Sequence, residues 1–423
     1  MGPYVISLPI STSSEHLEAL AEVSNFGRTD MGYPGQGPWT YCILPEESLD
    51  DKITGMSGAK SHPFGVDTVS LQPCLSYASR SQDRYITEEW DLPNGKWIFN
   101  VVLDGHLNHY TVDCIVQQLP KVVKDALYDS ARESLSMRPE YISEMLRSAI
   151  RQVDDCLTSR VLNLLPENMS GEDCVNNKDS TSELPDADLL LIAESLGGAT
   201  LVLSLTDSRG NLWIANLGDC RAVLGHRYAQ GWSGTQVTSV HDLNNPEELM
   251  RITQDHPGEI NAIKDNRVIG FLEPTRALGD TWLKIPASYT LRMYKNARQP
   301  WISPKQFDEY ASRILTPPYV SNIPDVYHLT PQTPYFLLLG SDGLLSTERY
   351  NGMNATQITG HWVNILGSVI DSGAETNINA ALCLLRDILG GEDIDMVSRN
   401  LTVEMEERWM DDITLLIQTV RNA

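Results

Sequence analysis

Four aspartates in this 423-residue chain each lie at one end of a short apolar run that is typical of a β-strand. They are Asp104, Asp219, Asp342 and Asp411, and long stretches of sequence separate them. Carboxylates gathered at the ends of neighbouring strands are the oxygen ligands that a pair of hard divalent cations requires. The sequence therefore predicts one metal site built from residues that are far apart along the chain.

Two of these aspartates are followed by glycine, in the pairs Asp104-Gly105 and Asp342-Gly343. Glycine allows a sharp backbone turn and exposes its carbonyl oxygen as a further ligand. Asp411 precedes its apolar run, so an antiparallel arrangement would bring it to the same end of the sheets as the other two. One Asp-Gly pair alone is more often an ordinary turn. Three aspartates together, each next to a strongly apolar strand, favour a metal site.

The elements that must position these residues come in clusters, without a steady β-α-β alternation. Apolar runs predict strands at 97–103, 200–205, 212–216, 221–224, 335–339 and 413–420. Helical spacing predicts helices at 109–129, 139–165, 246–253, 355–370 and 377–389, with a break or kink at Pro120 in the first. This order favours an α+β fold, in which helices pack outside antiparallel sheets.

The N-terminal residues 1–65 are rich in Gly, Pro and Ser and show no clear period, which predicts an irregular arm. Residues 66–423 are then most simply one domain. The acidic stretch 169–188 predicts a solvated loop.

Bulk composition excludes several classes of partner. The formal net charge of -24 makes nucleic acid and anionic membrane surfaces poor partners. No stretch approaches the roughly eighteen consecutive apolar residues of a membrane span. Seven dispersed cysteines without a Cys-x-x-Cys pair indicate reduced thiols. No basic residue precedes Arg28, which argues against a secretory or transit signal and favours a cytoplasmic protein.

Seven segments, taken in order, resemble the motifs of metal-dependent Ser/Thr protein phosphatases of the phosphatase 2C type. They are 81–84, 102–106, 198–200, 215–224, 275–280, 341–343 and 411–414, and they span roughly residues 80–420. Further details resemble the pyruvate dehydrogenase phosphatase branch, namely 241–248, 255–259, 316–319 and the pair Asp411-Asp412.

This resemblance implies a β-sandwich of two antiparallel sheets, flanked by helices on both sides, with a metal centre at one end. Asp104 would bridge two Mg²⁺ or Mn²⁺ ions, and the Gly105 carbonyl would bind the second. Asp342 and Asp411 would complete the shell of the first ion. Asp83 corresponds to another acidic residue of the centre, and Asp219 to a position linked to a weaker third ion.

The implied reaction is hydrolysis of phosphoserine or phosphothreonine. Two cations lower the pKa of a bridging water, so a hydroxide can attack phosphorus directly. His106 could then protonate the leaving oxygen; otherwise it is a packed turn histidine. Arg80 is a candidate phosphate clamp, because a guanidinium grips two phosphate oxygens, although its offset from Asp83 is shorter than the usual family spacing. Arg221 and Arg276 are better explained as structural ion-pair partners.

Some residues depart from the family pattern. Leu107-Asn108 replaces the usual small pair, and Ser346 replaces an acidic residue. These changes suggest an alternative, a weak or inactive pseudophosphatase that acts as a regulatory binding module.

The insertion 281–334 carries several basic residues in an otherwise acidic chain, among them Lys284, Arg292, Lys295, Arg298 and Lys305. It is either a flap that recruits a phosphoprotein or an ordinary solvated loop. The expected partner is a phosphoprotein, with pyruvate dehydrogenase in the mitochondrial matrix as one candidate, and the expected state is a monomer.

Overall fold

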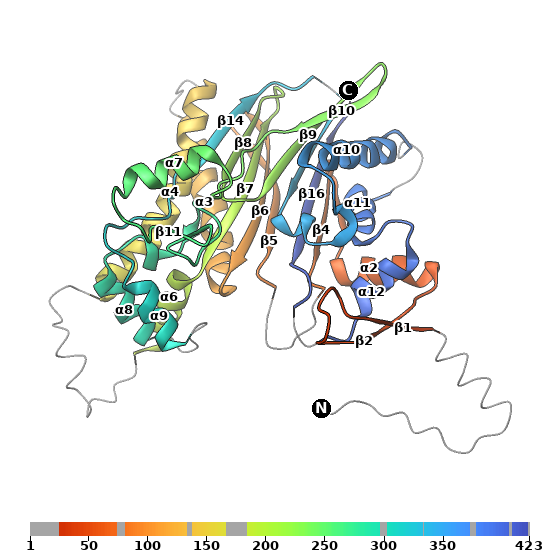
Figure 1. Ribbon diagram of the computed structural model, residues 1–423. Helices are drawn as coiled ribbons and strands as arrows, with labels where there is room; N and C mark the ends of the chain where they lie inside the picture. The colour runs from red at the N-terminus through yellow and green to blue at the C-terminus, as the bar shows by residue number, and fades with distance from the viewer. Residues whose placement is uncertain are drawn as a thin grey trace.

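Two antiparallel sheets pack face to face, and helices cover the outer face of each (Figure 1). The computed structural model describes residues 25–73, 81–132, 138–165, 184–296, 303–332, 334–372, 378–405 and 408–421. The expected α+β sandwich with helices on both sides is confirmed.

The first sheet has the strand order β10-β9-β15-β16-β4-β3. Its strands are β3 (Lys60–His62), β4 (Val66–Leu71), β9 (Arg221–Tyr228), β10 (Gly231–Gln236), β15 (Tyr335–Gly340) and β16 (Ile413–Val420). Because β15 and β16 are antiparallel, Gly340 at the end of β15 lies opposite Leu415, near the start of β16. This register brings the segments of Asp342 and Asp411 to the same end of the sheet.

The second sheet has the strand order β14-β8-β7-β6-β5, and the short β13 pairs with β7. Its strands are β5 (Arg84–Leu92), β6 (Gly95–His106), β7 (Gly198–Asp207), β8 (Leu212–Leu217), β13 (Leu278–Gly279) and β14 (Asp325–Leu329). His106 at the end of β6 lies opposite Gly198 at the start of β7. The predicted strands are confirmed, with ends that differ by a few residues.

The core between the sheets consists of side chains from the predicted apolar runs. It includes Val102, Val202, Ile214, Leu224, Leu337 and Leu416, each almost fully buried. Other residues of the same strands face outward onto helices, so both strand faces are apolar and the runs are continuous instead of alternating.

Helices α3 (Tyr110–Arg132) and α4 (Pro139–Leu164) cover the second sheet. Helix α3 runs through Pro120, where a break or kink was expected. Helices α2 (Glu46–Ser57), α10 (Ala355–Ser372), α11 (Ala380–Leu389) and α12 (Ile394–Thr402) cover the first sheet. Short 3₁₀ helices lie at η2 (Asp342–Leu345) and η3 (Glu348–Tyr350).

A further apolar cluster forms beside the second sheet. Its elements are α6 (Asp186–Leu196), α7 (Pro246–Asp255), β11 (Ile263–Lys264), β12 (Arg267–Val268), η1 (Thr281–Leu283), α8 (Ala287–Lys295) and α9 (Pro304–Ala311). In the described part of the insertion 281–334, η1, α8 and α9 therefore pack on this cluster, and the strand β14 joins the sheet. Lys284, predicted to be part of a basic flap, is a buried partner of Asp154, at 2.8 Å.

The N-terminal segment is more regular than predicted. Strands β1 (Phe26–Thr29) and β2 (Trp39–Cys42) form a hairpin, α2 follows, and β3 pairs with β4 of the sandwich. The prediction of an irregular arm was therefore wrong for residues 26–62. These elements are too short to produce a clear periodic signal; α2 buries little more than Leu49 and Ile53. Residues 1–24 and most of 169–188 lie outside the described residues.

Candidate metal centre

Three of the predicted aspartates meet where the two sheets end. Asp104 lies in β6, Asp342 begins η2 directly after β15, and Asp219 lies in the turn between β8 and β9. One carboxylate oxygen from each lies within 4.8 Å of the other two. The backbone N–H of Asp342 also faces Oδ2 of Asp104, at 3.4 Å. The tertiary structure thus assembles the cluster that the strand ends predicted.

The other two predicted acidic residues lie on either side of this cluster. Asp411 lines the same cavity, and its Oδ1 accepts a hydrogen bond from Nη2 of Arg408 at 2.6 Å. Asp83 is buried just before β5, where its Oδ2 accepts a hydrogen bond from the Ser341 hydroxyl at 2.8 Å. Asp83 does not line the cavity, so it lies behind the cavity wall.

The cavity has a volume of about 250 Å³. Its walls are Gln82, Asp104, Gly105, His106, Thr200, Asp219, Arg267, Leu272, Glu273, Pro274, Asp342, Arg408 and Asp411. A larger cavity of about 440 Å³ lies between α2, α10 and α11, but there Arg386 is already paired with Glu46 and Asp50. We therefore place the candidate site in the smaller cavity, where the clustered carboxylates lie.

Crowding and burial disfavour the ionised form of these carboxylates when no cation is bound. Burial and the charge of Asp342 raise the pKa of Asp219 to about 7. Burial, followed by the charges of Asp342, Asp83 and Asp219, raises the pKa of Asp104. Among the residues described, Oδ1 of Asp342 is buried and has no hydrogen-bond partner. A divalent cation would fit here, because it would give the unpaired oxygen a ligand contact and would offset the repulsion between the carboxylates.

His106 is held by an aspartate that the sequence did not single out. Nε2 of His106 donates to Oδ2 of Asp280 at 2.7 Å, and the Asp280 side chain is fully buried. Burial alone would lower the pKa of His106, but the charge and hydrogen bond of Asp280 outweigh it and raise that pKa. His106 also lines the cavity beside the aspartates. Asp280 ends the 275–280 motif, which was the available signal.

The glycines after Asp104 and Asp342 are needed for close approach. A Cβ on Gly105 would lie 2.7 Å from the carbonyl oxygen of Gln82, and one on Gly343 would lie 1.9 Å from that of Asp412. Neither glycine has a positive φ. Gly105 lies within β6, so the turn expected directly after Asp104 was wrong, whereas Gly343 lies in the tight 3₁₀ turn η2 after β15. At both positions steric contact with a neighbouring carbonyl requires glycine.

The unusual pair Leu107-Asn108 fits the start of α3. Leu107 adopts a left-handed backbone with φ of 70°. The Asn108 side chain accepts a hydrogen bond from the backbone N–H of Tyr110 at 2.8 Å and donates to the carbonyl of Ala193 at 3.0 Å. Asn108 therefore caps α3 and ties it to α6.

The arginines of the site divide into two groups. Arg267 and Arg408 line the cavity, and sequence reasoning missed both; they pair with Glu273 at 2.7 Å and with Asp411 at 2.6 Å. Arg276 is partly buried and forms ion pairs with Glu248 and Asp325, as its structural interpretation predicted. The candidate phosphate clamp Arg80 lies outside the described residues.

Two helix-covered antiparallel sheets with aspartates clustered at one end are the arrangement of a metal-dependent phosphatase. Residues 113–350 match the family model described as protein phosphatase 2C. The chain therefore belongs to the protein phosphatase 2C family of metal-dependent Ser/Thr phosphatases. The matched range includes Asp219, Asp280 and Asp342, whereas Asp104 and Asp411 lie on either side of it.

Individual relatives agree with the family. A protein phosphatase 2C homolog of Schizosaccharomyces pombe is 28% identical over 378 residues, which cover 82% of this chain and 78% of that protein. Human mitochondrial pyruvate dehydrogenase phosphatase 1 is 28% identical over 265 residues, or 54% of this chain. The matched region spans about half the length of that relative, 48%.

The similarity to a solved structure supports the fold. A serine-threonine phosphatase 2C from Toxoplasma gondii superposes with a TM-score of 0.52 at 17% identity, covering 85% of this chain and 96% of that chain. In the part of the chain that the structure describes, no helix is long and apolar enough to cross a membrane.

Proposed function

We propose that this chain is an active phosphatase whose centre holds two Mg²⁺ or Mn²⁺ ions. Asp104, the Gly105 carbonyl, Asp342 and Asp411 would hold these ions, with Asp83 behind them. Asp219 would hold a weaker third ion. The observation that carries the proposal is the convergence of Asp104, Asp219 and Asp342 within 4.8 Å in a cavity that is open to a ligand.

Bound divalent cations would supply an acidified water and neutralise the charge that develops on phosphorus. The protein's own contribution is to hold the carboxylates at fixed strand ends, so that no reorganisation is needed when the phosphate enters. His106 lines the same cavity, and Asp280 keeps its ring in place from behind. We infer that His106 delivers the proton to the leaving Ser or Thr oxygen.

The substrate that we propose is a phosphoprotein. The net charge of -24 repels phosphorylated ligands at long range, so local cations must reverse the field at the cavity. Arg267 and Arg408 on the cavity wall add positive charge there. Similarity to pyruvate dehydrogenase phosphatase supports that enzyme complex, in the mitochondrial matrix, as one candidate substrate, with a cytosolic phosphoprotein as the other.

The test is Mn²⁺-dependent release of phosphate from a phosphothreonine peptide. Chelation of the metal and Asp104→Asn should each abolish release, whereas Asp308→Asn, on the exposed face of α9, should leave it unchanged. A wild-type protein that binds Mn²⁺ but releases no phosphate would support the pseudophosphatase alternative. Release that survives both chelation and Asp104→Asn would refute the proposed centre.

A further inference from the structure

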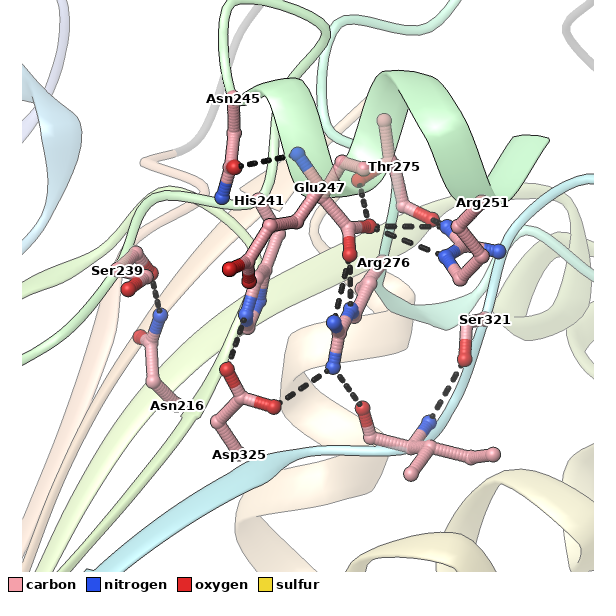
Figure 2. A network of polar contacts seen from close by, with 12 residues as sticks. Asn216, Ser239, His241, Asn245, Glu247, Arg251, Thr275, Arg276, Ser321 and Asp325 are labelled. Atoms are coloured by element: carbon pink, nitrogen blue, oxygen red, sulfur yellow. Dashed lines mark hydrogen bonds and ion pairs between the residues drawn. The ribbon is translucent and has the colours of Figure 1, made fainter. Parts of the chain in front are cut away.

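A network of polar contacts links His241, Asp325 and Arg276 (Figure 2). Arg276 donates to Oε1 of Glu248 at 2.6 Å and to Oδ1 of Asp325 at 3.0 Å. Oδ2 of Asp325 lies 3.1 Å from Nε2 of His241, which is 1% exposed. The network thus joins α7, the 275–280 motif, the first residue of β14 and the loop before α7.

His241 connects this network to Asp219. The backbone N–H of Gly218 donates to Nδ1 of His241 at 3.0 Å, and the backbone N–H of His241 donates to the Gly218 carbonyl at 2.9 Å. Gly218 immediately precedes Asp219 and has a left-handed backbone, with φ of 106°. The turn that carries Asp219 is therefore held by two hydrogen bonds between Gly218 and His241, one in each direction.

These contacts determine the tautomer of His241. A backbone N–H can only donate, so Nδ1 must present its lone pair to Gly218. The ring proton is then on Nε2, where it is donated to Asp325. A second ring proton would place two donors against each other at Gly218. The imidazole is therefore neutral, and Asp325 and Arg276 fix its orientation.

The segment of His241 also contacts a second part of the cavity wall. The backbone N–H of Thr275 donates to the His241 carbonyl at 2.8 Å. Thr275 directly follows Glu273 and Pro274, which line the cavity. A Cβ on Gly218 would approach the Arg276 carbonyl to 3.1 Å, so the two segments are in close contact.

We propose that His241 is a positioning residue for the metal centre: its neutral imidazole, oriented by Asp325 and Arg276, holds the Gly218 turn and so places the Asp219 carboxylate for cation binding. The assignment rests on the proposed metal centre. Nothing in the chain's similarity to its relatives assigns this role. Groups that orient metal ligands from behind typically change metal affinity by about 10- to 100-fold when removed.

Two substitutions separate the hydrogen bonds of the ring. In His241→Asn, the amide oxygen stands where Nδ1 does and still accepts from Gly218, but the contact with Asp325 is lost. In His241→Gln, the amide nitrogen reaches the place of Nε2 and still donates to Asp325, but the acceptor for Gly218 is lost. His328→Asn is the matched control. His328 lies on β14, as Asp325 does, but its ring bonds to Asn211.

The probe is Mn²⁺ alone, titrated into the full chain, with free Mn²⁺ measured by electron paramagnetic resonance. Unfolding by urea in chelator reports stability separately. We expect His241→Gln to weaken the weakest Mn²⁺ binding step by about 10-fold or more. We expect His241→Asn, which keeps the acceptor for Gly218, to weaken this step by less than His241→Gln does. The control should stay within about threefold of wild type, a difference of only about 0.6 kcal/mol.

Equal Mn²⁺ binding by both His241 variants and wild type would overturn the proposal. So would weakening that is equal in both variants and follows their loss of stability, because that would indicate a role in folding alone. If His241→Gln does not fold, Asp325→Ala tests the same link from a side chain that is 38% exposed. Mn²⁺ affinity in Asp325→Ala should fall at least threefold, about 0.6 kcal/mol, and unchanged affinity would also overturn the proposal. If wild type binds no Mn²⁺, the metal centre itself is refuted.

Discussion

Replacement of Glu248 by Gln should strongly destabilise this protein, and the penalty should shrink in acid. The Glu248 side chain is 2% exposed and accepts hydrogen bonds from Arg276 at 2.6 Å and Arg251 at 2.9 Å. Burial alone would raise its pKa, but the hydrogen bonds of Arg276, Arg251 and Thr275 lower the pKa of Glu248 from 4.5 to about 2.

The magnitude follows from this pKa. The carboxyl is a stronger acid in the folded protein than in the unfolded chain, so its charge stabilises the fold above the unfolded pKa. A folded pKa of about 2 against 4.5 corresponds to about 3 kcal/mol at pH 7. As pH falls toward the folded pKa the contribution is lost, and about 2 kcal/mol should remain at pH 3.5.

The assay is urea unfolding of the metal-free protein, followed by tryptophan fluorescence at pH 7 and at pH 3.5. The difference in free energy of unfolding between wild type and Glu248→Gln should be about 3 kcal/mol at the higher pH and smaller at the lower. Glu247→Gln, an exposed neighbour on α7, should change stability by less than about 0.5 kcal/mol. A Glu248→Gln penalty below about 1 kcal/mol at pH 7, or one that does not shrink in acid, would refute the reasoning.

Three further predictions concern other buried groups. Asp104→Asn should raise the melting temperature in chelator. The pKa of Asp104 is higher in the folded protein than in the unfolded chain, so its ionised carboxylate opposes folding at pH 7. A lower melting temperature would contradict this. Asp154→Asn should cost about 3–5 kcal/mol of unfolding free energy, because it leaves the buried Lys284 ammonium without a counter-charge; a penalty below about 1 kcal/mol would show that water reaches it. Asn108→Ala should cost about 1 kcal/mol in urea unfolding through loss of the α3 cap, and an unchanged midpoint would mean that solvent replaces the cap.

Most long elements were predictable, because their signal is local. Strand β6 and helix α4 each carry enough apolar residues at one spacing to identify them, and their ends differ from prediction by at most a few residues. The short elements β1, β2 and α2 and the helices α8 and α9 were not predicted. Their stability comes from contacts with distant residues, such as the bond of Cys42 N–H to the Thr402 hydroxyl at 2.9 Å.

In the candidate site, too, the residues with a local signal were predictable and the pairings between distant residues were not. Asp104, Asp219, Asp342 and Asp411 were visible because each adjoins an apolar strand, and the structure brings three of them within 4.8 Å while Asp411 lines the same cavity. The pairing of His106 with Asp280 joins residues 174 positions apart, and no local pattern encodes it.

The sequence by itself determined which acidic residues are candidates for the site and which strands adjoin them, because residue type and period are local properties. Only the tertiary structure decided what surrounds each group. It placed Asp83 behind the cavity, made Lys284 a buried ion-pair partner, and connected His241 to the Asp219 turn. Burial, pKa and hydrogen-bond partners depend on segments that meet only when the two sheets close on each other, and so they follow from the packing.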